Sequence, residues 1–216
     1  MDTSPIVAVA SSADDLEAVS ELLSALPAEY SAAFIVVQSL NAGREKLLAE
    51  ALAERTILPV VHAHDGILAE QGHVYLIPAN ATLTMSGRRI RVTPNAGKLH
   101  HPGDSLFTSL AKERGDSAIG VVLSGVGSDG ALGIRAIRQG GGTTFAQYPG
   151  SARFTSMPIS AIETGCVGFV LRPNEIAREL TRLSRHAAPL AGVALSALVS
   201  MTKRESAEAM ALQARS

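Results

Sequence analysis

Residues 118–139 constrain the fold of this 216-residue chain more than any other segment. Small and β-branched apolar residues fill positions 119–123, glycines punctuate positions 124–130, and apolar residues then recur at helical spacing. This order predicts a strand, a tight turn and a helix. In an open α/β sheet such a turn lies at the carboxyl end of a strand, where ligands and catalytic side chains gather. The one carboxylate in the turn, Asp129, is therefore a candidate site residue.

The first part of the chain shows the same alternation of strand and helix. Short apolar runs at residues 5–10, 34–37 and 58–62 have the composition of strands buried on both faces, and residues at helical spacing separate them. Three strands that alternate with two helices indicate a parallel sheet. The pattern changes after Asp65.

Short apolar pieces beyond Asp65 look antiparallel. They lie at residues 74–78, 83–85 and 90–92, and the last two are joined by a Ser-Gly-Arg turn. The remaining expected elements are strands at 143–147 and 167–171 and helices at about 104–114, 157–163 and 173–183. Together they predict a three-layer α/β/α fold, with a doubly wound, mostly parallel sheet and an antiparallel hairpin insertion.

The amino-acid composition limits the kinds of protein that this chain can be. Hydrophobic residues make up 46% of the chain, which supports one core, so we expect a domain over residues 1–186 and a helical appendage over 187–216. The 19 basic and 20 acidic residues form no long run of either sign, which speaks against nucleic-acid binding. A single cysteine, Cys166, excludes an internal disulfide framework, and no apolar stretch is long enough to span a bilayer. We expect a cytoplasmic protein without membrane insertion.

The glycine-rich turn also fits a nucleotide-binding pattern. Residues 125–130 match G-x-G-x-x-G between a predicted strand and a predicted helix. The acidic residue that would meet a ribose about 20 residues later is missing from positions 145–150, and Asp129 would direct negative charge at a pyrophosphate. Nucleotide binding is therefore the weaker alternative, and we expect no cofactor.

Two further places combine residues with chemistry of their own. His62 and His64 share one face of a predicted strand, with Asp65 just beyond, but no third metal ligand is tied to them by spacing. Histidines at the end of a strand explain this pair, so no metal site is predicted. Ser12 follows the first strand where a helix begins, and it is either an N-cap or a nucleophile whose oxyanion backbone amides would stabilise.

Seven separated blocks resemble, in order and spacing, the catalytic domain of the CheB family of chemotaxis protein-glutamate methylesterases. From about residue 6 to 186 they read VAVASSADDLEAVSELLSALP, FIVVQSL, VVHAHDGILAEQGHVYLIP, HHPGDSLFTSLA, GVVLSGVGSDGALGIRAI, FAQYPGSARFTSMPISAI and GCVGFVL. The resemblance implies a doubly wound α/β domain that hydrolyses glutamyl methyl esters on chemoreceptor cytoplasmic domains with a Ser-His-Asp triad and no cofactor. The receiver domain often found ahead of this domain is absent, so we expect no phosphorylation control within the chain.

The resemblance also implies roles for individual residues. It places the nucleophile at Ser12, the triad aspartate at Asp129, and the oxyanion hole at the backbone amides of Ala13 and Val126. The position of the triad histidine falls on Ser39, and serine does not accept a proton at neutral pH as imidazole does.

Other departures from the family pattern surround the nucleophile. Asp14 and Asp15 replace a glycine pair, and Val126 replaces a methionine. Two functions stay open: a serine-type carboxylesterase whose base is either missing or recruited, or a catalytically degenerate homologue that acts as a binding or regulatory module. The candidate replacement bases are His62, His64, His100 and His101. Under either function the expected partners are chemoreceptor cytoplasmic domains or other chemosensory signalling proteins.

Overall fold

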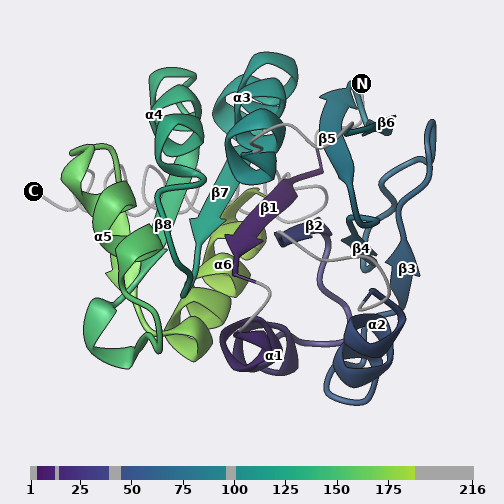
Figure 1. Ribbon diagram of the computed structural model, residues 1–216, viewed down its shortest axis with the longest axis horizontal. Helices are drawn as coiled ribbons and strands as arrows, with labels where there is room; N and C mark the ends of the chain where they lie inside the picture. The colour runs from purple at the N-terminus through teal and green to yellow at the C-terminus, as the bar shows by residue number, and fades with distance from the viewer. Residues whose placement is uncertain (1–3, 13–14, 39–44, 96–100, 188–216) are drawn as a thin grey trace, which may run out of the picture. The chain divides into compact units, whose positions relative to one another are not determined.

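The computed structural model describes residues 4–12, 15–38, 45–95 and 101–187 (Figure 1). The chain divides into two units, residues 1–184 and 185–216, and the fold described below is that of the first. The domain boundary expected after residue 186 stays a prediction.

Nine strands and six α-helices lie within the described residues. In chain order they are β1 (Ile6–Ser11), α1 (Leu16–Ser24), β2 (Ala33–Gln38), α2 (Glu45–Ala53), β3 (Val60–His62), β4 (Val74–Leu76), β5 (Ala81–Ser86), β6 (Arg89–Pro94), α3 (Pro102–Arg114), β7 (Ala118–Val122), α4 (Ala131–Gln139), β8 (Thr143–Gln147), α5 (Ser156–Glu163), β9 (Phe169–Leu171) and α6 (Pro173–Ala187).

The main sheet has seven strands in the order β3-β4-β2-β1-β7-β8-β9, and every pair of neighbours is parallel. All residues of β1, β2 and β7 are buried, as their apolar composition requires for strands covered on both faces. The chain passes from β1 to β2 on one side and later returns to β7 on the other side of β1. The carboxyl ends of β1 and β7 therefore form a topological switch point.

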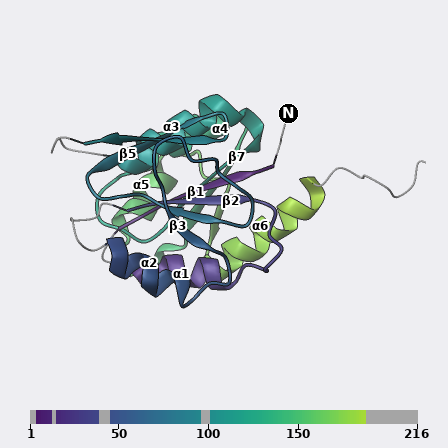
Figure 2. The ribbon, with the colours of Figure 1, turned by 90° about the vertical axis from the view of Figure 1, so that its right-hand side faces the viewer.

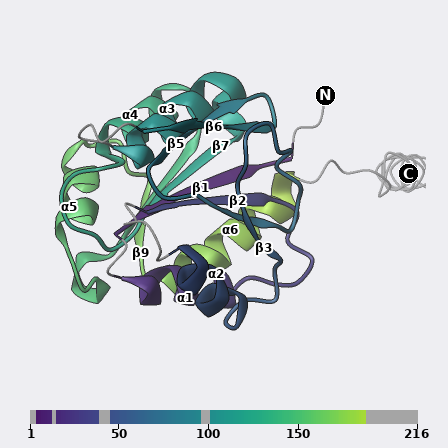
Figure 3. The ribbon, with the colours of Figure 1, turned by 45° about the vertical axis from the view of Figure 1, so that its right-hand side comes forward.

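Helices cover both faces of this sheet. Ile6, Ala8 and Ala10 of β1 belong to one core cluster with residues of α3, α4, α5 and the β5-β6 hairpin. Val7 and Val9 belong to a second cluster with residues of α1, α2 and α6. Figures 2 and 3 show α3 and α4 on one side of the strands and α1, α2 and α6 on the other. The doubly wound, three-layer fold predicted from the sequence is confirmed.

The expectation that residues 74–78 form an antiparallel piece is wrong. The strand within this segment, β4, lies in the main sheet between β3 and β2 and pairs in parallel with both. All three residues of β4 are buried, because the strand has neighbours on both edges and packing on both faces. Its unbroken apolar run is the composition of a buried parallel strand.

The hairpin insertion itself is confirmed. β5 and β6 pair antiparallel from Ala81↔Pro94 to Ser86↔Arg89, and Gly87 in the turn has a φ of +59°, which favours glycine. The hairpin is joined to α3, because the Ser109 hydroxyl accepts a hydrogen bond from Met85 N at 2.9 Å. None of the described helices is long and apolar enough to cross a membrane.

Candidate active site

Ser12 lies directly after β1, at the switch point. Its backbone N–H donates to Ser124 O after β7 at 3.1 Å. On the other side, the Gln38 side chain at the end of β2 donates from Nε2 to Ser11 Oγ at 2.7 Å and to Ser12 O at 3.2 Å. The backbone of Ser12 is thus held from both neighbouring strands.

The first turn of α3 packs against β1 close to Ser12. A Cβ at Gly103 would lie 2.9 Å from Ala10 Cβ and 3.1 Å from each carboxylate oxygen of Asp129, so only glycine fits there. Side chains alternate along a strand, and Ala10 belongs to the core cluster on the α3 side. Ser12 comes two residues after Ala10, so the same alternation, continued one step beyond β1, predicts that side for Ser12.

Asp129 lies in the turn between β7 and α4, where Gly127 and Gly130 adopt φ values of +95° and +91° that favour glycine. Its Oδ2 accepts a hydrogen bond from Gly103 N and its Oδ1 from Asp104 N, both at 2.9 Å. The carboxylate therefore satisfies two free amides at the N-terminus of α3. It connects the turn after β7 to the helix that precedes β7.

Opposing effects act on the pKa of Asp129. Burial raises the pKa of this carboxyl above its ordinary value and is the largest effect. The hydrogen bonds from Gly103 and Asp104 lower the pKa, the negative charge of Asp104 raises it, and His101 lowers it. The net direction is upward, so the folded chain favours the protonated form of Asp129 more than an exposed aspartate would.

His101 and Asp104 lie beside Asp129. His101 Nδ1 is 3.9 Å from Asp129 Oδ1, and about half of its side chain is exposed. Asp104 Oδ1 accepts a hydrogen bond from Gly133 N of α4 at 2.9 Å, which ties α3 to α4. A groove of about 450 Å³ adjoins these residues, lined by His101, Asp104, Ser128, Ala131, Leu132, Arg135, Ser160, Glu163 and Thr164.

His101, Asp104 and Asp129 could also be considered as metal ligands. Each offers one ligand atom, and these atoms lie within 4.8 Å of one another, the one such group among the described residues. Three of the four carboxylate oxygens already accept backbone amides, and the N-terminus of α3 presents positive potential that opposes a cation. We assign the group to a hydrogen-bonded network.

The turn after β7 offers a free backbone amide. Gly125 N donates to Phe154 O at 3.0 Å and Gly127 N donates to Ser156 Oγ at 3.3 Å, but Val126 N–H between them has no partner within the described residues. A Cβ at Gly125 would lie 3.0 Å from Ser12 N, so this turn passes close to Ser12. The Val126 amide can therefore donate to a group bound at the switch point.

The other residues predicted for the site either lie outside the described part of the chain or lie far from the switch point. Ala13, Ser39 and His100 lie outside the described residues. His62 and His64 are exposed and lie at or just beyond the end of β3, the edge strand. Because β4 and β2 separate β3 from β1, these two histidines are about 14 Å or more from the switch point.

Sequence reasoning missed three residues that hold the site together. Gln147 is buried and its Oε1 accepts a hydrogen bond from Ser124 N at 2.8 Å, while Gly103 and Asp104 bind Asp129. The signal for the last two was present, because Pro-Gly-Asp after two histidines marks a helix N-terminus, where a carboxylate is a favourable partner. No signal in the sequence identifies that carboxylate as Asp129.

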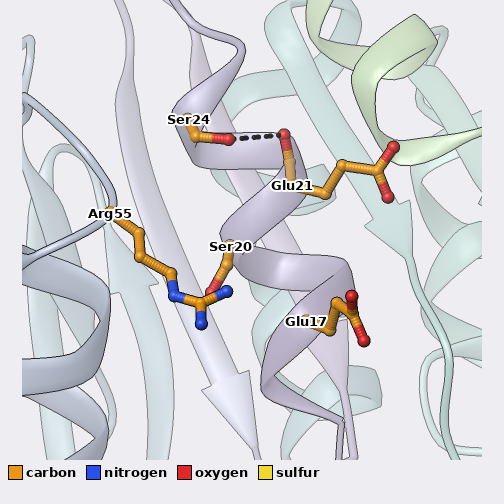
Figure 4. Close-up of a pocket in the computed structure, with 5 residues that line it drawn as sticks. All are labelled: Glu17, Ser20, Glu21, Ser24 and Arg55. Carbon is orange, nitrogen blue, oxygen red and sulfur yellow. Dashed lines mark hydrogen bonds between the residues drawn. The ribbon is translucent and has the colours of Figure 1, made fainter.

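A second hollow, of about 390 Å³, lies on α1 and is not part of the switch point. It is lined by Glu17, Ser20, Glu21, Ser24 and Arg55. Figure 4 shows the Arg55 side chain extending toward Ser20, whose buried hydroxyl has no hydrogen-bond partner. That hydroxyl is shielded from solvent, so a molecule in the hollow would not reach it without a rearrangement.

The chain resembles proteins of known family in its sequence. The model of the family described as CheB methylesterase matches residues 7–180. A protein-glutamate methylesterase/protein-glutamine glutaminase 3 of Anaeromyxobacter dehalogenans is 38% identical over 179 residues, which cover 81% of this chain and 52% of that protein. The corresponding protein of the group 3 operon of Rhizobium meliloti is 36% identical over 183 residues, covering 83% of this chain and 52% of the relative.

A solved structure resembles the chain as well. The CheB methylesterase catalytic domain of Thermotoga maritima superposes with a TM-score of 0.76 at 27% sequence identity, and the match covers 83% of this chain and 98% of that one. The chain spans about half the length of the two methylesterase relatives, whereas it matches almost the whole of the solved catalytic domain.

Proposed function

Because the chain belongs to the CheB methylesterase family, we propose that it is a serine-type carboxylesterase that removes methyl groups from glutamyl methyl esters of chemoreceptors. Two relatives are named protein-glutamate methylesterases, which supports this choice of reaction. The structural match to a methylesterase catalytic domain supports an active site in this chain. The observation that carries the proposal is the free Val126 amide in the turn that contacts Ser12.

Ser12 acts as the nucleophile in this proposal. Its Oγ attacks the ester carbonyl, and the negative charge that develops on the carbonyl oxygen accepts a hydrogen bond from Val126 N–H. Such donors, aimed at a developing oxyanion, are among the largest contributions to catalysis of acyl transfer. Ala13 N–H would be the second donor, as the family resemblance implies. Loss of methanol leaves an acyl-serine, which water hydrolyses to the free glutamate.

Asp15, three residues after the nucleophile, fits this chemistry better than the sequence alone suggests. Asp15 is buried, and its side chain accepts a hydrogen bond from Ala18 N at the start of α1. Its charge is thereby oriented toward the positive end of that helix and is partly compensated. Asp15 acts as an N-cap, which lessens its repulsion of a developing oxyanion.

The alternative, a catalytically degenerate homologue that binds or regulates, rests on Ser39 at the position of the family histidine. Ser39 lies outside the described residues. Under both readings the partners that we propose are chemoreceptor cytoplasmic domains or other chemosensory signalling proteins, and the location is the cytoplasm. The two readings differ in whether the chain turns over an ester.

Methanol release from a methylated chemoreceptor fragment tests the proposal. We expect the native chain to release methanol and Ser12→Ala to fall to the background rate, because the acyl acceptor is gone. Ser24→Ala, a matched change at the exposed end of α1, should leave the rate unchanged. Equal release by the native chain and Ser12→Ala, or no release by the native chain, would contradict the assignment.

A further inference from the structure

One described histidine lies beside a carboxylate at the switch point. His101 Nδ1 is 3.9 Å from Asp129 Oδ1, whereas His64 and His73 contact backbone oxygens of Asp65 and Gln71. Asp129 Oδ1 accepts one amide hydrogen and keeps a lone pair for a second donor. Half of the His101 side chain is exposed, so the ring has room to close the remaining distance of about 1 Å to a hydrogen bond.

The direction of α3 places His101 on the same side as Ser12. α3 ends at Arg114 and leads through a short turn into the start of β7, so the N-terminus of α3 lies at the carboxyl edge of the sheet. Gly103 of α3 contacts Ala10 of β1. His101 lies two residues before Gly103, and Ser12 lies two residues after Ala10. Both steps lead from this contact toward the carboxyl edge of the sheet.

We propose that His101 is the general base for Ser12 in this chain, in place of the imidazole that position 39 does not supply. The inference rests on the proposed function. A hydrogen bond from His101 Nδ1–H to Asp129 would fix the tautomer in which Nε2 is free to accept a proton. In unliganded sites such hydrogen bonds are often long and shorten when substrate binds.

His101 takes up one proton and gives it back in each half of the reaction. His101 Nε2 takes the proton of Ser12 Oγ–H as the bond from Oγ to the ester carbon forms. The imidazolium then gives this proton to the methoxy oxygen as the bond from carbon to that oxygen breaks, and methanol leaves. His101 next takes a proton from water as the water oxygen attacks the acyl-serine. It returns that proton to Ser12 Oγ, and the glutamate is released.

Four charged residues lie in the cluster and the groove to which His101 belongs. Asp129 and Asp104 each offer a carboxylate oxygen within 4.8 Å of a His101 ring nitrogen. Arg135 and Glu163 line the adjoining groove with opposite charges. Two carboxylates in direct proximity stabilise the imidazolium that forms when His101 accepts the proton.

Covalent labelling of Ser12 tests this role without the natural substrate. A fluorophosphonate reacts with an activated serine, and mass spectrometry locates the adduct. We expect the native full chain to be labelled at Ser12 at a rate that rises with pH through a single histidine titration. His101→Gln should react roughly 100-fold more slowly, as expected for loss of a general base, and should lose this inflection. His64→Gln, an exposed histidine near β3, is the matched control and should behave as the native chain does.

We expect His101→Gln to fold as the native chain does, so slower labelling would not result from unfolding. Ser105 donates to the backbone oxygen of His101 and not to its ring, so His101→Gln keeps these hydrogen bonds, and its thermal melt should match the native one. Labelling of His101→Gln at the native rate, an unchanged pH profile, or no labelling of Ser12 in the native chain would overturn the role of His101.

The methanol assay separates the two proposals. Methanol release that depends on Ser12 but persists in His101→Gln would leave the esterase intact and refute the base. Labelling that depends on His101, without methanol release from the methylated receptor, would support the base and refute the proposed substrate.

Discussion

Asp129 serves two purposes at the scale of single residues. It satisfies the first amides of α3, and it is the carboxylate nearest to His101. The glycine-rich turn was enough to single out Asp129 from the sequence. Its partners were not predictable, because Gly103 and Asp104 lie about 25 positions earlier and no periodicity links the two segments.

The raised pKa of Asp129 predicts a pH dependence of stability. A pKa raised in the folded state means that the folded chain binds this proton more tightly than the unfolded chain. The contribution to the free energy of unfolding is therefore fully present below the ordinary pKa of 3.8 and is lost as pH rises through the folded pKa. As pH rises over that range, we expect the free energy of unfolding of the native chain to fall relative to that of Asp129→Asn.

Urea unfolding of both proteins at a series of pH values measures this difference. Other carboxylates cancel in the comparison, because they are common to both chains. The prediction would be wrong if the difference in free energy of unfolding did not change with pH, or if the native chain became relatively more stable as pH rises. Either result would show that burial is not the largest effect on the pKa of Asp129.

At the scale of elements, sequence periodicity identified most strands and helices but not their neighbours. The apolar runs of β1, β2 and β4 have similar composition, so nothing in them specifies which pair together. The short apolar run at residues 74–78 follows the change of pattern after Asp65 and looks like the hairpin strands, so the sequence predicts an antiparallel piece there. Its place between β3 and β2 results from pairing with strands that are distant along the chain.

The packing of α3 on β1 predicts a sharp effect at Gly103. In Gly103→Ala the new methyl group would meet Ala10 Cβ at 2.9 Å and the Asp129 oxygens at 3.1 Å, and neither neighbour can move without shifting an element. We expect a loss of about 1–3 kcal/mol in the free energy of unfolding, as for overpacked cores. Methanol release should also fall, because the helix start that holds Asp129 is displaced.

Gly140→Ala is the matched control for this change. Its nearest non-neighbouring atom would be a backbone oxygen at 3.4 Å, and its φ is not in the left-handed region. Urea unfolding should place this variant within about 0.5 kcal/mol of the native chain. Equal stability of Gly103→Ala and Gly140→Ala would mean that α3 does not approach β1 as closely as described.

At the scale of the whole molecule, the sequence carried the fold class and the family. Apolar strands alternating with helical spacing specify a parallel sheet covered on both faces, and seven blocks in order specify the family. The candidate site was predictable only in part. Ser12 and Asp129 follow strands whose carboxyl ends meet, but the approach of His101 to Asp129 depends on how α3 packs, which no local pattern encodes.

The most direct test of the account compares the initial rates of methanol release by the native chain and by Ser39→His, measured side by side on one methylated chemoreceptor fragment. We expect the native chain to release methanol without an imidazole at position 39, because His101 supplies the base. Methanol release by Ser39→His alone would contradict it, and would identify the native chain as a homologue that keeps the scaffold and has lost the reaction.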